Sequence, residues 1–505
     1  MPTRRPPVDL RSQRRVLTAA LGLTLLSGTG CTSHSGYLPL EQERLFPHIS
    51  HGTVPAETAQ RCHQALDSRN AYPTYRRALE ELRRGSTIAT IPHLGCLLPA
   101  DGRERSSGDL YAQLVSEVFL PNVLNGYLQK RLGEVIAQDI QQGQRRDAGL
   151  AWPGAYLLEA CVVAYRNSGE TRFLDLFQQT FDQVLQRRDI HTGYRDVLRE
   201  RATHGWSSIN ISEEKRSKHN GPPFLTGHVT HAARIVYPAT EFARVVRSRP
   251  ELQSRYGASA DRYVAASRDA INDFNEDWQV VPGQTVPGSQ RPLRWYRRPI
   301  TNSLEATNHV HMVASAWLNL AQLTADPSYL QKAQDAVAIF RKGTTEKPQG
   351  FIHWNYFPFF ATKERKLYSH GREYSEAIWK ASLTTPFIAR AGRQGLPEAK
   401  QLSTSIARAI HREVLSETNI RRNISSQDSR WFDPNDPADK KQLGKLTNVT
   451  YFLEYADLEP AIARQLRRLT AGRPDLFPRG WIGSESGALG YAHLLPAKPA
   501  PNPKP

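Results

Sequence analysis

The residues best suited to chemistry in this sequence are two histidines, His228 and His231, which stand where a long polar loop meets an apolar segment. The loop begins at Trp206, and the segment LTGHVTHAARIVYPATEFARVV that follows it has the apolar spacing of a helix. In a helix, side chains three residues apart project from one face on neighbouring turns. Because imidazole changes charge near neutral pH and can act as a general base, this junction is the first candidate for catalysis. A structural or surface pair of histidines is the alternative.

Aromatic and basic residues also gather in three further loops, within residues 291–298, 353–357 and 368–374. Aromatic rings offer flat faces to sugar rings, and arginines pair with carboxylates or sulfates. The combination is typical of a site for an acidic sugar chain, although each aromatic ring could instead serve packing. The expected substrate-binding residues are Trp206, Asn210, His228, Arg291, Arg294, Arg297, His309, Trp354, Tyr356, His370 and Arg372.

The elements that must position these residues are helices joined in pairs. Apolar stripes on either side of the joins at 168–174, 324–330 and 395–397 predict three helical hairpins. Repeated hairpins bury their faces by stacking, and the long loops 189–226, 279–303 and 349–375 favour a closed ring over an open solenoid. We expect an all-α dominated fold, an α/α toroid or incomplete barrel, with minor β elements near the C-terminus as a further possibility. Its active cleft should be built from the long loops at one end.

The N-terminus reads as an export segment. Five arginines precede a short apolar run from Val16 to Leu26, and small residues then lead to Cys31. That order resembles the bacterial lipoprotein processing site, which predicts lipidation of Cys31 and a periplasmic or outer-membrane-associated protein. We expect a signal at residues 1–30, a polar linker at 31–55, a toroid domain at 56–490 and a disordered proline-rich tail at 491–505. An oxidising compartment would also permit a disulfide between Cys62 and Cys96, with Cys161 buried in a helix.

Charge points to the class of partner. The formal net charge is +17, and removal of residues 1–30 leaves +13. An exported basic protein suits an anionic polysaccharide or surface, and no zinc-finger spacing or RNA-binding motif favours nucleic acid. We expect no organic cofactor. We also expect no metal site, because His309 with His311, and His228 with His231, lack a third ligand at useful spacing.

At this point the sequence resembles a known group. The order of G-W-S-S, then H-x-x-x-I-x-Y-P at 231–238, then W-Y-R-R-P at 295–299, and then a helix ending in T-A-D-P-S-Y-L is similar to α/α-toroid polysaccharide lyases of the alginate and glucuronan lyase type. The resemblance covers residues 150–380. It implies β-elimination at a uronic acid, which needs a base, an acid and a group that neutralises the carboxylate.

The resemblance also implies roles for individual residues. His231 would be the base, with His228 as the reserve, and Tyr296 would be the acid. The arginines around Tyr296 should lower its pKa, which would let it share or take over the base role. Asn308, Asn210 or an arginine within 291–298 would neutralise the substrate carboxylate. Under this hypothesis, Tyr296→Phe and His231→Ala should each remove most turnover while polymer binding is retained.

Two rival hypotheses stand beside the lyase. A glycoside hydrolase on the same toroid would use a pair of carboxylic acids, for which loop candidates exist but no pair is marked by its spacing. A non-catalytic envelope lipoprotein would need the aromatic and basic groove but not His231. The carboxylates available to a hydrolase are Asp189, Asp196, Glu305 and Glu373.

Overall fold

The computed structural model describes residues 120–141, 149–209, 225–299, 301–347, 352–364, 376–424, 430–473, 475–477 and 484–495, all within the compact unit Tyr37–Pro505. In this part of the chain, no helix is both long and apolar enough to span a membrane. The export segment, the linker, Cys31 and the Cys62–Cys96 pair lie outside the described residues. Cys161 is described, and it is a buried free cysteine.

The three predicted helical hairpins are confirmed. They are α7 (Ala155–Ser168) with α8 (Arg172–Leu185), α13 (Thr307–Thr324) with α14 (Pro327–Lys342), and α16 (Ile378–Arg393) with α17 (Pro397–Ala409). Gly169 ends α7 with a φ of 70°, a left-handed conformation that glycine adopts without a steric cost. At the second join, the side chain of Asp326 caps α14 by accepting a hydrogen bond from Ser328 N.

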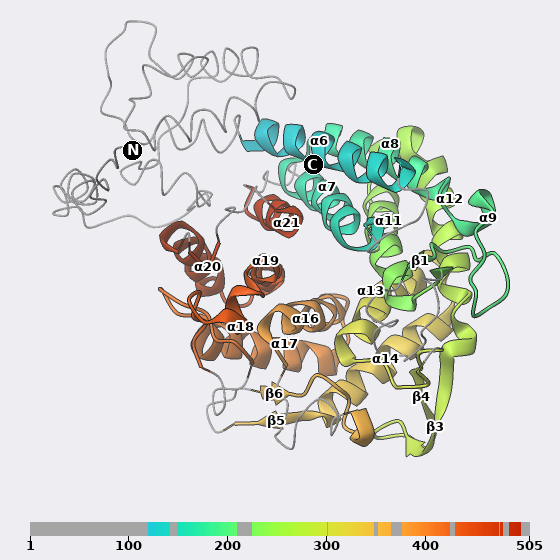
Figure 1. Ribbon diagram of the computed structural model, residues 1–505. Coiled ribbons are helices and arrows are strands. Elements are labelled where there is room, and N and C mark those ends of the chain that lie inside the picture. Colours follow the sequence, from blue (N-terminus) through green and yellow to red (C-terminus); the bar gives the residue numbers. More distant parts are fainter. Residues whose placement is uncertain are drawn as a thin grey trace, which may run out of the picture. The chain divides into compact units, whose positions relative to one another are not determined.

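Helices within the described residues form a closed ring of pairs (Figure 1). The inner members follow one another by contact: α7, α11 (Val229–Arg247), α13, α16, the 3₁₀ helix η7 (Thr447–Tyr455) and α21 (Glu485–His493), which packs back on α7. The outer members are α8, α12 (Pro250–Asn272), α14, α17, α20 (Ala461–Gly472) and α6 (Leu120–Gln141). The predicted α/α toroid is therefore present, and α21 carries it past the boundary expected at residue 490.

Short elements occupy the connections between these helices. The β elements form three separate two-stranded antiparallel ladders, β1 with β2, β3 with β4 and β5 with β6. All of these strands lie in mid-chain, in the long loops or next to them, whereas the described C-terminal part has only isolated bridges such as Arg421 with Trp431. The remaining elements are η4 (Leu150–Gly154), α9 (Asp189–Thr192), β1 (Ser208–Ile209), β2 (Leu225–Thr226), η5 (Asn275–Asp277), β3 (Trp278–Thr285), β4 (Pro292–Tyr296), β5 (Thr344–Glu346), β6 (Ile352–Trp354), η6 (Ile410–Val414), α18 (Pro437–Lys440) and α19 (Leu443–Leu446).

The seam between inner and outer helices is apolar and rich in aromatic rings. Phe173, Phe177 and Phe181 recur every four residues along α8, and each is 0% exposed. Phe177 stacks on Phe242 of α11 at 4.8 Å, while Phe181 meets the edge of Tyr263 of α12 at 4.8 Å. Burial of each ring contributes about 1.5–3 kcal/mol to the stability of the fold. These ring contacts therefore stabilise the packing of the α7–α8 hairpin against α11 and α12.

The inner helices, by contrast, share a buried ionic network. Arg390 of α16 donates to Glu159 of α7 at 2.6 Å and to Glu454 of η7 at 2.8 Å. Arg234 of α11 donates to Tyr451 OH at 2.5 Å, and Tyr451 in turn donates to Glu159. These contacts join four inner helices around the ring.

Arg390→Ala should destabilise the protein strongly, because the buried carboxylates of Glu159 and Glu454 each lose the guanidinium that pairs with them. Loss of one partner of a buried ion pair costs about 3–5 kcal/mol, which denaturant unfolding would measure. Arg255→Ala is the matched control, since Arg255 is 58% exposed in its pair with Asp175, and it should change stability by about 0.5 kcal/mol or less. Equal effects of the two substitutions would show that the network does not stabilise the ring.

Candidate functional site

A pocket of about 610 Å³ opens where inner helices begin. The starts of α7, α13, α16, η7 and α21 all contribute side chains to it. Helix N-termini carry a partial positive charge, so this end of the ring favours an anionic ligand. The lining residues are Trp152, Pro153, Tyr156, Asn308, His309, Tyr356, Trp379, Lys380, Leu383, Leu443, Gly444, Lys445, Thr447, Asn448, Phe477, Ser484, Glu485 and Ser486.

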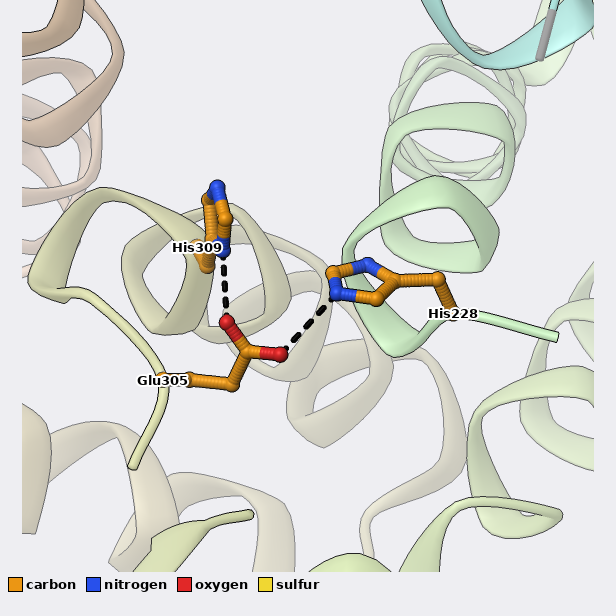
Figure 2. A group of neighbouring side chains, drawn as sticks. All are labelled: His228, Glu305 and His309. Atoms are coloured by element: carbon orange, nitrogen blue, oxygen red, sulfur yellow. Dashed lines mark hydrogen bonds and ion pairs between the residues drawn. The ribbon is translucent and has the colours of Figure 1, made fainter. Parts of the chain in front are cut away.

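Behind the pocket wall, Glu305 joins two histidines (Figure 2). His228 precedes α11, and its Nε2 lies 2.9 Å from Glu305 Oε1. His309, in the first turn of α13, places its Nδ1 2.6 Å from Glu305 Oε2. The cluster therefore links the starts of two adjacent inner helices, which is why residues far apart in sequence meet here.

Arg298 holds the shared carboxylate in its ionised form. Its Nε lies 3.1 Å from Glu305 Oε2, and the side chains of both residues are buried. Burial alone would raise the pKa of Glu305, but the guanidinium of Arg298 and the two imidazoles outweigh it and hold that pKa well below its usual range. Glu305 is thus a buried anion that accepts hydrogen bonds.

The same three residues offer one ligand atom each within 4.8 Å, a donor set that zinc could use. The guanidinium of Arg298 also lies against this set, with Nη2 3.3 Å from His309 Nδ1. A divalent cation bound to these atoms would sit beside a fixed positive charge. The contacts of these three residues with one another and with Arg298 form a network of hydrogen bonds and ion pairs.

His309 is the member of the cluster that reaches the pocket, with a side chain 18% exposed. Burial lowers its pKa to about 4, an effect that Glu305 offsets only in part, so the ring is neutral at physiological pH. Two groups compete for Nδ1: the Glu305 carboxylate at 2.6 Å, which can only accept, and Arg298 Nη2 at 3.3 Å, which can only donate. The closer carboxylate favours the proton of the neutral ring on Nδ1. Among the described residues, no group hydrogen bonds to Nε2. The lone pair of Nε2 is therefore available to a ligand in the pocket.

His231, the predicted base, lies beside the pocket but does not line it. Its Nε2 accepts a hydrogen bond from Trp152 Nε1 at 3.3 Å, and its Nδ1 is 3.4 Å from Ser208 Oγ. Burial, together with the neighbouring His228 and His309, holds its pKa well below the usual value. His231 is neutral as expected for a base, but its lone pair is already occupied.

Tyr156, which the sequence did not single out, lines the pocket and bonds through its hydroxyl to a second lining residue, Asn448. It donates to Asn448 Oδ1 at 2.9 Å, and the guanidinium of Arg234 lies 4.2 Å from the centre of its ring. Burial raises the pKa of Tyr156 to about 12, although Arg234 acts in the opposite direction. The hydroxyl thus stays protonated near neutral pH and can donate a proton.

Tyr296, the predicted acid, has a different position. It is 0% exposed, between Trp278 at 4.9 Å and Trp317 at 5.9 Å. Burial raises its pKa, with a further contribution from Asp277, so the prediction that the arginines lower the pKa was wrong. At the end of β4 the adjacent residues Trp295 and Tyr296 are both buried, whereas Arg294 is exposed.

The other aromatic predictions divide between core and pocket. Trp206 is 4% exposed and donates to the backbone of Val184, and Trp354 is 3% exposed and donates to Glu376. Both tryptophans are structural, because their polar atoms are satisfied inside the protein. Tyr356, in contrast, lines the pocket, where Lys380 Nζ lies 3.7 Å from its ring centre.

The predicted arginines lie away from the pocket lining. Arg291 forms an exposed ion pair with Asp335, Arg294 donates to Trp278 O, and Arg297 donates to Asn302 O. Asn308 does line the pocket, and its buried Oδ1 has no hydrogen-bond partner in the described part of the chain. Asn210, His370, Arg372 and Glu373 lie outside the described residues.

The carboxylates weighed for a hydrolase have structural partners. Asp189 is 0% exposed and accepts from Thr203 and Ser207, while Asp196 is 0% exposed and pairs with Arg199. Among the described residues that line the pocket, Glu485 is the one acid, and it pairs with Arg131. A pair of free carboxylic acids is therefore missing from the described lining.

Sequence reasoning missed Trp152, Tyr156, Asn448, Lys380 and Lys445 as lining residues. Each stands at or just before the start of an inner helix rather than in a long loop. The available signal was positional, because a closed ring brings the starts of its inner helices to one end. Aromatic and polar residues at those starts were therefore candidates.

Comparison with known proteins does not place the chain in a family. No family model matches it, and no curated protein does. Among solved structures it is similar to a family 76 glycoside hydrolase from a bovine Bacteroides thetaiotaomicron strain, with 13% identity, 68% of each chain covered and a TM-score of 0.40.

Two further structures are similar to the same degree. Cellobiose 2-epimerase from Bacillus thermoamylovorans has 13% identity, with 71% of this chain and 86% of that chain covered and a TM-score of 0.38. An inactive α-1,6-mannanase variant of Salegentibacter sp., in complex with α-1,6-mannotetrose, has 10% identity, with 73% and 96% covered and a TM-score of 0.39. Similarity at this level assigns no activity to the chain.

Proposed function

We propose that this protein is a polysaccharide lyase that cleaves an acidic, uronate-containing polysaccharide by β-elimination. The observation that carries the proposal is the neutral His309, whose unpartnered Nε2 shares a pocket with the protonated hydroxyl of Tyr156. A base and an acid with these protonation states are what elimination requires. Export and lipid anchoring at Cys31 belong to the same proposal.

The pocket suits an anionic sugar. Trp152, Tyr356 and Trp379 supply aromatic faces for sugar rings. Lys380 and Lys445 bring positive charge, while Glu485, the acid in the described lining, is neutralised by Arg131. The helix N-termini add to this positive potential.

The steps of the reaction follow from these groups. Asn308 and the lysines would bind the uronate carboxylate and stabilise the enolate that forms when the C5 proton leaves. His309 Nε2 takes this proton, and the electron pair forms the C4–C5 double bond as the C4–O4 bond breaks. Tyr156 donates its proton to O4 of the departing sugar. Solvent then restores both side chains.

The lyase hypothesis predicts a broad pH plateau for kcat/KM. The base works only when His309 is neutral, above its pKa of about 4, and the acid only when Tyr156 is protonated, below its pKa of about 12. Activity should therefore fall as the pH drops through the region of 4, and no limb should occur near 6.5. Initial rates after brief pH jumps would test this. An acid limb at the ordinary histidine pKa would contradict the assignment of a buried His309 as base.

The proposal itself is tested by product chemistry with purified protein and a panel of alginate, glucuronan, hyaluronan and pectic polymers. A lyase produces an unsaturated uronate, seen as absorbance near about 232 nm. New reducing ends without this absorbance would overturn the lyase in favour of a hydrolase. Binding without either signal would identify a non-catalytic polysaccharide-binding protein.

A further inference from the structure

We propose that Glu305 is a positioning residue that fixes the tautomer of His309 and stabilises its charge when it takes a proton. The inference rests on the proposed function, since it concerns the base of that reaction. It assigns to Glu305 a role unlike that of a hydrolase carboxylate. Figure 2 shows the arrangement that carries it.

The geometry makes Glu305 an acceptor on both oxygens. Oε1 faces His228 Nε2 at 2.9 Å, and Oε2 faces His309 Nδ1 at 2.6 Å and Arg298 Nε at 3.1 Å. With two imidazoles and the ion-paired guanidinium against it, the ionised carboxylate has no proton to give, and both of its oxygens are occupied. The role left to Glu305 is to orient the imidazoles of His228 and His309.

The contact with Glu305 determines the protonation of Nε2, the nitrogen of His309 that is available to a ligand in the pocket. The ionised carboxylate at 2.6 Å favours the proton on Nδ1 over the longer, 3.3 Å contact from Arg298 Nη2, and this leaves Nε2 as an acceptor. In the opposite tautomer, Nε2 would carry the proton and could not act as a base. After proton uptake His309 is a cation, and the adjacent negative charge of Glu305 stabilises it, as in other carboxylate–histidine pairs.

Arg298 also helps to position Glu305. Its guanidinium lies against Glu305 Oε2, the oxygen that also faces His309. A residue that replaces Glu305 must therefore still offer an acceptor to Arg298. Glu305→Gln should therefore keep its carbonyl oxygen toward His309 and Arg298. This variant preserves orientation but removes charge, whereas Glu305→Leu removes both.

The first test is the tautomer of His309, read by ¹⁵N chemical shifts in histidine-labelled full-length protein without substrate. His309→Gln assigns the signal. We expect Nδ1 protonated and Nε2 bare in the wild type and in Glu305→Gln, with loss of this preference in Glu305→Leu. A wild-type signal with the proton on Nε2 overturns the inference, and this result depends on no variant at position 305.

The second test is turnover of the polymer that gives unsaturated product. Glu305→Gln should lower kcat by about 10- to 100-fold with KM nearly unchanged, and Glu305→Leu should lower it further. Arg298→Lys, which keeps the positive charge, should retain more activity than Arg298→Met. Wild-type kcat in Glu305→Gln refutes the charge role. Failure of the lyase proposal would appear separately, as absence of unsaturated product from the wild type.

Discussion

Replacing His309 with alanine should abolish nearly all turnover, with a loss in kcat of about 10²- to 10⁴-fold. The substitution removes the one imidazole of the cluster that lines the pocket with an unoccupied lone pair. Binding of the polymer should persist, because aromatic faces and lysines supply most of the contact. Rates of unsaturated-product formation, measured beside polymer affinity, separate the two effects.

Two comparisons make this test specific. Added imidazole should restore part of the activity of His309→Ala, since it can occupy the space of the missing base. His231→Ala should have a smaller effect on kcat, because His231 is already bonded to Trp152. If His231→Ala instead removed more activity than His309→Ala, the original assignment of His231 as the base would be correct.

The second large effect should come from Tyr156→Phe, with a loss of about 10²-fold or more in kcat. The change deletes the hydroxyl that donates to Asn448 and leaves the ring that packs above Arg234. A substrate with a better leaving group at C4 needs less protonation, so it should be far less affected. This dependence on the leaving group would show that Tyr156 acts as the acid.

Tyr296→Phe is the matched control for that experiment. The hydroxyl of Tyr296 is buried and has no hydrogen-bond partner in the described residues, so its removal should leave kcat unchanged and stability nearly so. A large loss in Tyr296→Phe together with an active Tyr156→Phe would return the acid role to Tyr296. The pair of variants therefore decides between the sequence-based and the structure-based assignments.

Much of the fold could be predicted from local pattern. The apolar stripe of α8, with Phe173, Phe177 and Phe181, and the turn at Gly169 both predict a helical hairpin without knowledge of its neighbours. Ring closure was inferred from the long loops, and the contact of α21 with α7 confirms it. The short strands lie in those loops or directly beside them.

The site was predicted only in part, and for a physical reason. His228, His309, Asn308 and Tyr356 were chosen by residue type, and all four lie at the pocket or at the cluster behind it. Tyr296, Trp206 and Trp354 have the same chemical types but point into the core, because burial depends on which strand or helix face a residue occupies. Residue type alone does not specify that face.

The sequence by itself determined the helical hairpins, their turns and the presence of titratable side chains near helix starts, since these depend on residues close together in the chain. Only the tertiary structure decided that Glu305 lies between His228 and His309, and that Arg298 keeps it ionised. Protonation state and tautomer depend on burial and on charges brought together by ring closure. Such contacts leave no periodicity in the sequence, so the roles proposed for His309 and Tyr156 depend on the folded ring.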